Sequence, residues 1–133
     1  MSRTRTAAPR ALAGVFVVSG IFHFARPTFF DPLMPRAIPD RFHRPLIYGS
    51  GAAELVCAFG LARRSRWASA ASTALLLAVW PANLQVALDA GTGRNAGGMD
   101  SAAVAWGRMP LQLPMLWAAR QAVGRRPRTP PEA

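Results

Sequence analysis

The sequence contains no lysine and a single cysteine, and it has very little charge inside its longest apolar stretches. A lone cysteine, Cys57, excludes an intrachain disulfide and any CxxC redox motif. The lack of lysine accompanies abundant alanine and indicates biased base composition, so we read no function from it. The missing charge is informative, because a soluble helix places charged residues on one face at helical period and these stretches do not.

Four apolar stretches dominate the 133 residues, and each is about as long as the ~20 residues that a bilayer core requires of a helix. Apart from Arg10 and Arg120 near their ends, these stretches hold one basic residue, Arg108, and one acidic residue, Glu54. The predicted fold class is therefore an all-α integral membrane bundle of four transmembrane helices. The predicted spans are residues 7–25, 45–62, 67–88 and 101–123, in a membrane domain over 7–123 with a basic N-terminus at 1–6, an outer loop at 26–44 and a disordered basic tail at 124–133.

Arginines are divided unequally between the two ends of these spans. With the N-terminus inside, ten arginines lie on the cytoplasmic side and five on the outer side, where four aspartates also lie. An excess of arginine marks cytoplasmic loops, so the prediction is an N-in/C-in, multi-pass protein of a bacterial cytoplasmic membrane. The first stretch resembles a signal peptide but has no convincing small-residue cleavage site before Pro27, so we expect an uncleaved span.

The predicted outer loop is both apolar and rich in proline. Five prolines between residues 27 and 45 prevent one long helix. Phe30, Leu33 and Met34 would be costly in bulk water. We therefore expect the loop to lie in the membrane interface or to fold over the end of the bundle as a cap.

Five polar residues lie inside or at the ends of the spans and carry whatever chemistry the chain has. These residues, which form the predicted ligand-binding cluster, are His23, Glu54, Asn83, Arg108 and Gln112. At about 1.5 Å per residue, Glu54, Asn83 and Arg108 lie roughly 14, 9 and 10 Å below the outer ends of their helices. The predicted topology therefore places all five in the outer half of the membrane, within reach of one another.

Each of these residues also has a structural interpretation. His23 could simply reach the lipid headgroups, and Asn83 and Gln112 could be hydrogen-bonding links between helices. Glu54 and Arg108 are harder to explain singly, because an unpaired charge in the bilayer core costs about 2.5–3.5 kcal/mol or more. We expect the two to pair, either as a structural clamp or as part of a ligand site.

Other classes of site are poorly supported. The net charge of +10 is gathered at termini and between spans, whereas a nucleic-acid binder presents a basic stripe on a folded face. Two histidines and one buried carboxylate make a poor metal-ligand set, so no metal is expected. No catalytic residues can be named, because the sequence contains neither a phosphate-binding glycine loop nor a credible serine–histidine pair.

The order of motifs resembles that of DoxX-like membrane proteins. The resemblance rests on five segments spread from about Ala11 to Trp117. They are His23-Phe24 with Pro27, Phe30 to Pro39 in the first loop, Tyr48 to Glu54 (an S-G-x-x-E type segment), Trp80-Pro81-Ala82-Asn83 (similar to F-P-A-N), and Arg108 to Gln112 (similar to R-L-P-x-Q, with Met109 in place of leucine). The resemblance implies a four-helix membrane bundle and, in some relatives, a redox-associated or chaperone-like role. The cysteine-dependent branch does not carry over, because Cys57 has no partner.

The leading hypothesis is an accessory or redox-associated membrane subunit whose outer polar pocket binds a small ligand such as a quinone. Arg108 and Gln112 would donate hydrogen bonds to the ligand, with Glu54 holding Arg108 or accepting a proton. Any reaction would belong to a partner, such as a membrane or periplasmic redox protein. The alternatives are a non-enzymatic chaperone or assembly factor and a small-molecule permease working as a homo-oligomer. The only other predicted partner is the lipid bilayer.

Overall fold

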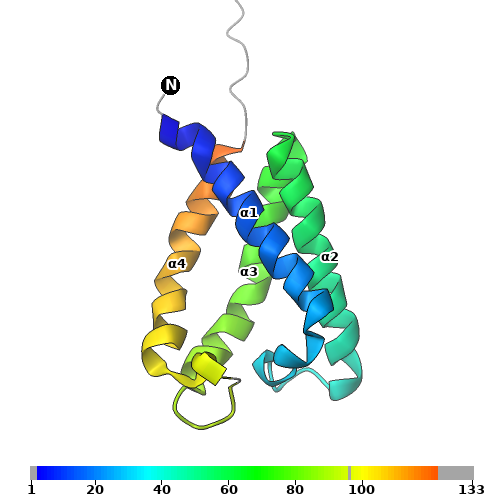
Figure 1. The fold of residues 1–133 in the computed structure, drawn as a ribbon, viewed down its shortest axis with the longest axis vertical. Coiled ribbons are helices and arrows are strands. Elements are labelled where there is room, and N and C mark those ends of the chain that lie inside the picture. Colours follow the sequence, from blue (N-terminus) through cyan, green and yellow to red (C-terminus); the bar gives the residue numbers. More distant parts are fainter. Residues whose placement is uncertain (1–2, 96, 123–133) are drawn as a thin grey trace, which may run out of the picture.

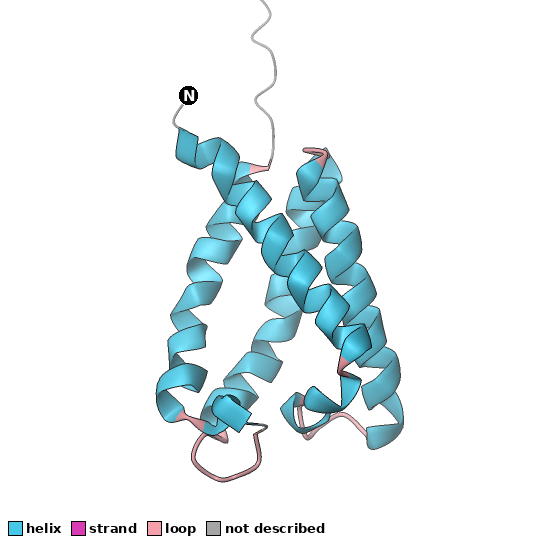
Figure 2. Cartoon of the chain, in the orientation of Figure 1, coloured by secondary structure: helices cyan, strands magenta, loops and turns pink. Residues whose placement is uncertain are grey.

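The structure is a computed structural model that describes residues 3–95 and 97–122. Within these residues every regular element is helical, so the all-α prediction is confirmed (Figures 1 and 2). The elements in chain order are α1 (Arg3–Ala25), η1 (Pro27–Phe29), η2 (Asp31–Leu33), η3 (Asp40–Phe42), α2 (His43–Ala62), α3 (Arg66–Leu88), η4 (Gly97–Asp100) and α4 (Ala102–Gln121).

The helices pack as two close pairs, α1 with α2 and α3 with α4, joined into one bundle (Figure 1). Short loops or compact turns join consecutive helices, and consecutive helices run in opposite directions (Figure 1). We call the end with residues 26–42 and 89–101 the loop end, and the end with residues 63–65 the turn end. At the turn end Arg64 has a φ of 56°, and the Ser65 amide donates to the Gly60 carbonyl at 2.9 Å. This left-handed residue reverses the chain between α2 and α3.

Helix ends differ slightly from the predicted boundaries. The helix α1 begins at Arg3, within the predicted N-terminal segment 1–6, and α4 ends at Gln121. Pro27 follows α1, and its ring disfavours the helical conformation of Arg26, whose ψ is 58°. The predicted disordered tail, residues 124–133, lies outside the described residues.

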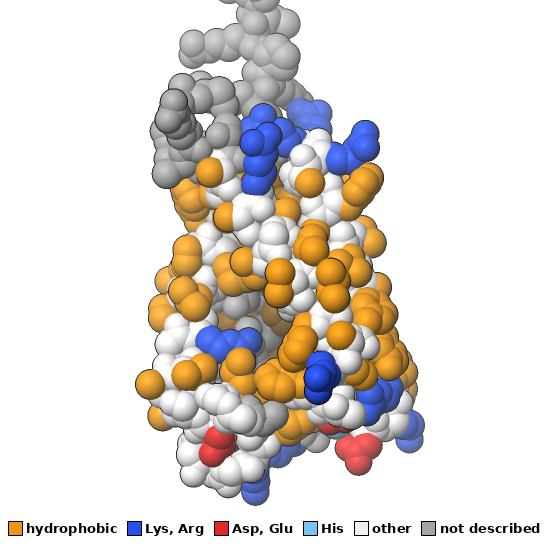
Figure 3. Space-filling model, in the orientation of Figure 1, with side chains coloured by type: hydrophobic (Ala, Val, Ile, Leu, Met, Phe, Trp, Pro, Cys, Tyr) orange, Lys and Arg blue, Asp and Glu red, His pale blue; other side chains and the backbone are white. Residues whose placement is uncertain are grey.

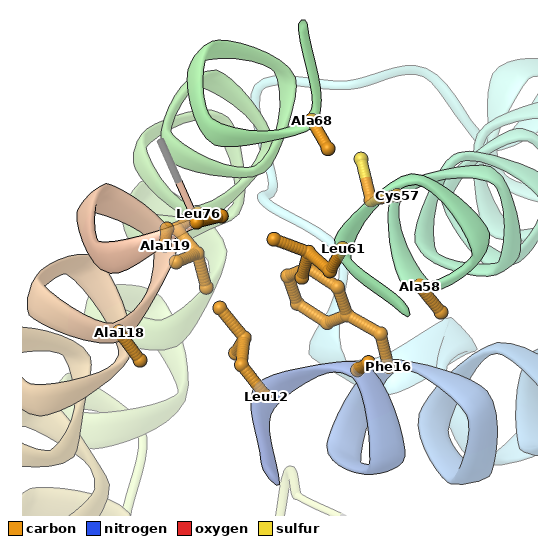
Figure 4. Close-up of a cluster of buried hydrophobic side chains, with 11 residues drawn as sticks. Leu12, Phe16, Cys57, Ala58, Leu61, Ala68, Leu76, Ala118 and Ala119 are labelled. Carbon is orange, nitrogen blue, oxygen red and sulfur yellow. The ribbon is translucent and has the colours of Figure 1, made fainter. Parts of the chain in front are cut away.

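The main core lies among the four helices and consists largely of small residues. Leu12 and Phe16 of α1 fill its centre, and alanines from α2, α3 and α4 surround them (Figure 4). Cys57 is buried in this cluster as a small apolar residue. A Cβ added to Gly60 would lie 2.6 Å from the Trp67 ring, so a glycine is needed where α2 meets α3. Small residues at these points let the helix backbones approach closely.

The outer surface of the bundle is apolar over most of its length. Val18 is 72% exposed and Leu113 is 69% exposed, and every helix contributes further exposed apolar residues. Figure 3 shows an apolar belt with most of the charged side chains at the two ends. Three segments, Ala7–Ala25, Asp40–Ala62 and Arg66–Leu88, are long and apolar enough to cross a membrane. The hydropathy of α4 falls short of that standard, which its Arg108 and Gln112 explain in part.

The loop between α1 and α2 is folded against the bundle. Leu33 is buried in a second cluster with Val86, Ala87 and Ala105, which come from α3 and α4. Phe29 and Phe30 pack on the edge of this cluster. Arg36 binds the carboxylate of Asp89, which is buried at the end of α3. The predicted cap is therefore present, and short 3₁₀ turns between the prolines form it.

Candidate functional site

The predicted site begins at the closest approach of α1 and α2. A Cβ on Gly20 would lie 2.9 Å from the carbonyl oxygen of Gly51, and one on Gly51 would lie 2.7 Å from the Cβ of His23. The helices are too close at Gly20 and at Gly51 for any residue larger than glycine. The two glycines therefore bring the neighbouring Ser19 and His23 on α1 against Glu54 on α2.

Ser19, His23 and Glu54 form a first polar group. The Ser19 hydroxyl donates to Oε1 of Glu54 at 3.1 Å. Nδ1 of His23 donates to the Ser19 carbonyl at 2.8 Å, and it must carry a proton because a carbonyl oxygen only accepts. The same nitrogen lies 3.4 Å from Oε2 of Glu54. That oxygen is buried and accepts no hydrogen bond from the described residues.

The loop covers this group on one side. The Phe30 ring stacks on the His23 ring with 3.8 Å between centroids and an angle of 17° between planes. Phe22 and Phe29 meet Phe30 edge to face. His23 is only 9% exposed as a result, so the interpretation of His23 as a side chain that reaches the headgroups does not fit the structure.

Asn83, Arg108 and Gln112 form a second polar group between α3 and α4. Nη2 of Arg108 donates to Oδ1 of Asn83 at 3.4 Å, and Nδ2 of Asn83 donates to Oε1 of Gln112 at the same distance. Nη1 of Arg108 lies 3.0 Å from the Met99 sulfur, a weak acceptor. The chain of contacts fixes the rotamers of all three side chains at one level of the bundle.

Gln112 is anchored to the backbone of α3. Its Nε2 donates to the carbonyl of Leu76, and the side chain is buried. Pro81 lacks the N–H that would bond to the next carbonyl, that of Leu77, so the helix ladder is interrupted in this turn. Gln112 therefore links α3 and α4, and its predicted role as a donor to a ligand is the weaker interpretation.

The predicted pair of Glu54 and Arg108 does not form. Within the described residues Glu54 contacts Ser19 and His23, whereas no carboxylate lies within ion-pair distance of Arg108. The physical reason is the packing: Gly20 and Gly51 draw Glu54 toward α1, while Asn83 and Met99 hold Arg108 beside α3 and the η4 turn. Glu54 and Arg108 line the same cavity from different helices, but the predicted contact between them is absent.

Members of both polar groups face one cavity between the four helices, and His23 is not part of its lining. Its volume is about 240 Å³. Ser19 and Glu54 lie on one wall, and Asn83, Arg108 and Gln112 lie on the other. The remaining lining is apolar, from residues such as Phe16, Leu76 and Val79. The cavity combines a few convergent polar groups with apolar walls, which is the usual character of a small-molecule site.

Comparison with known proteins places this site inside a family. The family model described as "Domain of unknown function (DUF8561)" matches residues 12–122. The chain belongs to this family. The match contains all five predicted site residues, but the family's description assigns no function, so the resemblance to DoxX-like proteins stays a prediction. No curated protein matches the chain, and no solved structure matches it.

Sequence reasoning missed some members of the site. The Ser19 hydroxyl is the main partner of Glu54, although Ser19 stood out only as a small residue one turn from His23. The sequence does not indicate that Met99 belongs to the site, because Met99 lies in a glycine-rich segment that predicts only a turn between two helices. Pro81 removes the helical partner of the Leu77 carbonyl, so it points to this turn of α3 but not to the Leu76 carbonyl itself.

Proposed function

We propose that the chain is an integral membrane protein of the DoxX type with four transmembrane helices and both termini in the cytoplasm. Support for a fourth span comes from α4, which is 20 residues long and exposes Val104, Trp106, Leu113 and Trp117. In this orientation the loop end lies on the outer side. A bacterial cytoplasmic membrane is the location that this topology suits.

The charges at the two ends support this orientation. At the turn end, Arg63, Arg64 and Arg66 have no acidic partner among the described residues. At the loop end, Arg36 pairs with Asp89 and Arg44 pairs with Asp31. Uncompensated arginine favours the cytoplasmic side.

We propose that the cavity binds a small ligand through carbonyl or anionic oxygens, as a quinone headgroup would offer. The observation that carries this proposal is Arg108. Its guanidinium borders the cavity with an amide oxygen and a thioether as its partners, and neither neutralises its charge. A cation in hydrocarbon needs an acceptor, and two oxygens of a ligand would supply one.

The residues present fit a quinone headgroup. Arg108 would donate to one carbonyl oxygen, and the Asn83 amide would fix the direction of the guanidinium. On the opposite wall, Glu54 in its carboxylic acid form would donate to the second carbonyl, while the Ser19 hydroxyl donates to the Oε1 of Glu54 and His23 fixes the side chain. A bound quinone would supply electron and proton transfer, which would belong to a redox partner, and this chain would hold and orient it.

The experiment is recovery of the ligand from native membranes. The full chain would be extracted in lipid particles without detergent, and the bound small molecules would be identified by mass spectrometry. We expect a quinone to accompany the wild type and to be lost from Arg108→Gln. Arg120→Gln is the matched control, because Arg120 is an exposed arginine in the last turn of the same helix. A wild type without quinone, or equal retention in Arg108→Gln, would contradict the proposal.

A further inference from the structure

A second cavity lies beside the first, on the face of the bundle between α1 and α4. Its volume is about 590 Å³, and it shares Val15, Ser19 and Arg108 with the inner cavity. The rest of its lining is almost entirely apolar. It consists of Gly14, Val18 and Phe22 of α1, Phe29 and Phe30 of the loop, and Met99. Arg108 therefore lies at the junction between the internal site and an apolar recess on the surface.

This recess follows from the way α1 crosses the bundle. Figure 1 shows α1 and α4 close together near the N-terminus and apart toward the loop end, and Figure 3 shows a hollow on this face. The packing of α1 against α2 is far more extensive than its packing against α4. Gly14 contributes no side chain to close the gap, and a Cβ built there would meet no atom within 4 Å.

The apolar recess continues toward the turn end as a groove between the same helices. A further cavity of about 260 Å³ is lined by Ala8, Ala11, Leu12 and Val15 of α1 and by Pro114, Met115, Trp117 and Ala118 of α4. Val15 belongs to all three cavities. From Val18 to Ala8 the groove follows α1 for ten residues, or about 15 Å.

We infer that the ligand of the Arg108 site is a quinone with a long apolar tail, which enters sideways from the bilayer and lies along the α1–α4 groove. The inference rests on the proposed function and adds the route by which the ligand enters and the place where its tail binds. A headgroup bound at Arg108 has an apolar exit to the surface through the recess, whereas the Phe30 stack closes the side toward the loop. The groove is one furrow, which fits the single tail of a quinone better than the two chains of a phospholipid.

Gly14 allows a sharp test. Gly14→Leu would place a side chain in the groove without a clash in the fold, since the space around the Cβ position is open. Gly49→Leu is the matched control, because Gly49 is also a helical glycine whose Cβ would meet nothing within 4 Å, and it borders none of these cavities. Both variants of the full chain would be placed in lipid nanodiscs with a short-tailed or a long-tailed quinone of the same headgroup. Binding would be measured as the rise in unfolding temperature with the mole fraction of quinone.

We expect the wild type and Gly49→Leu to bind the long-tailed quinone more tightly than the short-tailed one. Gly14→Leu should weaken the long-tailed quinone by about tenfold, as expected when roughly two methylene groups lose their burial, with less effect on the short-tailed one. If the wild type binds both quinones equally and Gly14→Leu binds them as the wild type does, the tail proposal is overturned and the headgroup site stands. No stabilisation of the wild type by either quinone would overturn the proposed function itself.

Discussion

Arg108 on α4 donates a hydrogen bond to the amide oxygen of Asn83 on α3, at 3.4 Å. Asn83 in turn donates a hydrogen bond to Gln112 on α4, so a row of hydrogen-bonded side chains joins the two helices. Glu54, the acid expected to neutralise Arg108, lies across the cavity and is engaged by Ser19 and His23. The charge of Arg108 is therefore directed at the cavity, and this is the feature from which the functional proposal follows.

This arrangement predicts two different double-mutant cycles. Arg108→Gln and Asn83→Ala should couple, because the two side chains touch, with an interaction energy of about 0.5–1.5 kcal/mol. Glu54→Gln and Arg108→Gln should each destabilise the protein, but their losses should add to within about 0.5 kcal/mol. The measurement is the free energy of unfolding in mild detergent. Strong coupling between Glu54 and Arg108 would mean that the two side chains meet directly.

The glycines between α1 and α2 give a second prediction. Gly51→Ala would drive a methyl group into the Cβ of His23, and the overpacking should cost about 1–3 kcal/mol of unfolding free energy. Gly49→Ala, two residues away with open space around it, should be neutral or stabilising by up to ~1 kcal/mol, because alanine favours the helix. Thermal unfolding of the two variants provides the comparison. Equal stability would show that α1 and α2 do not approach as closely as described.

Hydropathy and residue spacing predicted the helices of this protein and which polar residues line its inner cavity. The apolar stretches indicated the helices because the hydropathy of a whole stretch depends on many residues at once. Helix ends such as Arg3 and Gln121 depend instead on the local conformation of a few residues. The fixed rise of a helix gives Glu54, Asn83 and Arg108 similar predicted depths, and all three line the inner cavity. Contacts between particular side chains also depend on how each helix is rotated. Close packing at Gly20 and Gly51 sets that rotation, so the choice of Ser19 over Arg108 as the partner of Glu54 could not be derived.

The loop cap should protect its apolar residues from water. In a Cys57→Ser background, Phe30→Cys and Met34→Cys should react with a water-soluble thiol reagent at least about tenfold more slowly than Ala37→Cys. Phe30 packs on the bundle and Met34 is half-buried, whereas Ala37 is exposed in the same loop. The rate of labelling in intact membranes is the measurement. Similar rates at all three positions would indicate a solvated loop that does not cover His23.

The proposed topology predicts where a reporter will work. A reporter that is active only in the cytoplasm should give signal when it is fused to the C-terminus or inserted between Arg63 and Arg66. An insertion at Gly97, in the turn between α3 and α4, should give none, because four spans with the N-terminus inside place this turn on the outer side. A second reporter, active only outside the cytoplasm, should give the opposite pattern and so controls for poor expression. Cytoplasmic signal at Gly97 together with signal at the C-terminus would mean that α4 does not cross the membrane. The wall of the inner cavity that α4 forms would then lie outside the bilayer, and neither a quinone headgroup nor its tail would be expected there.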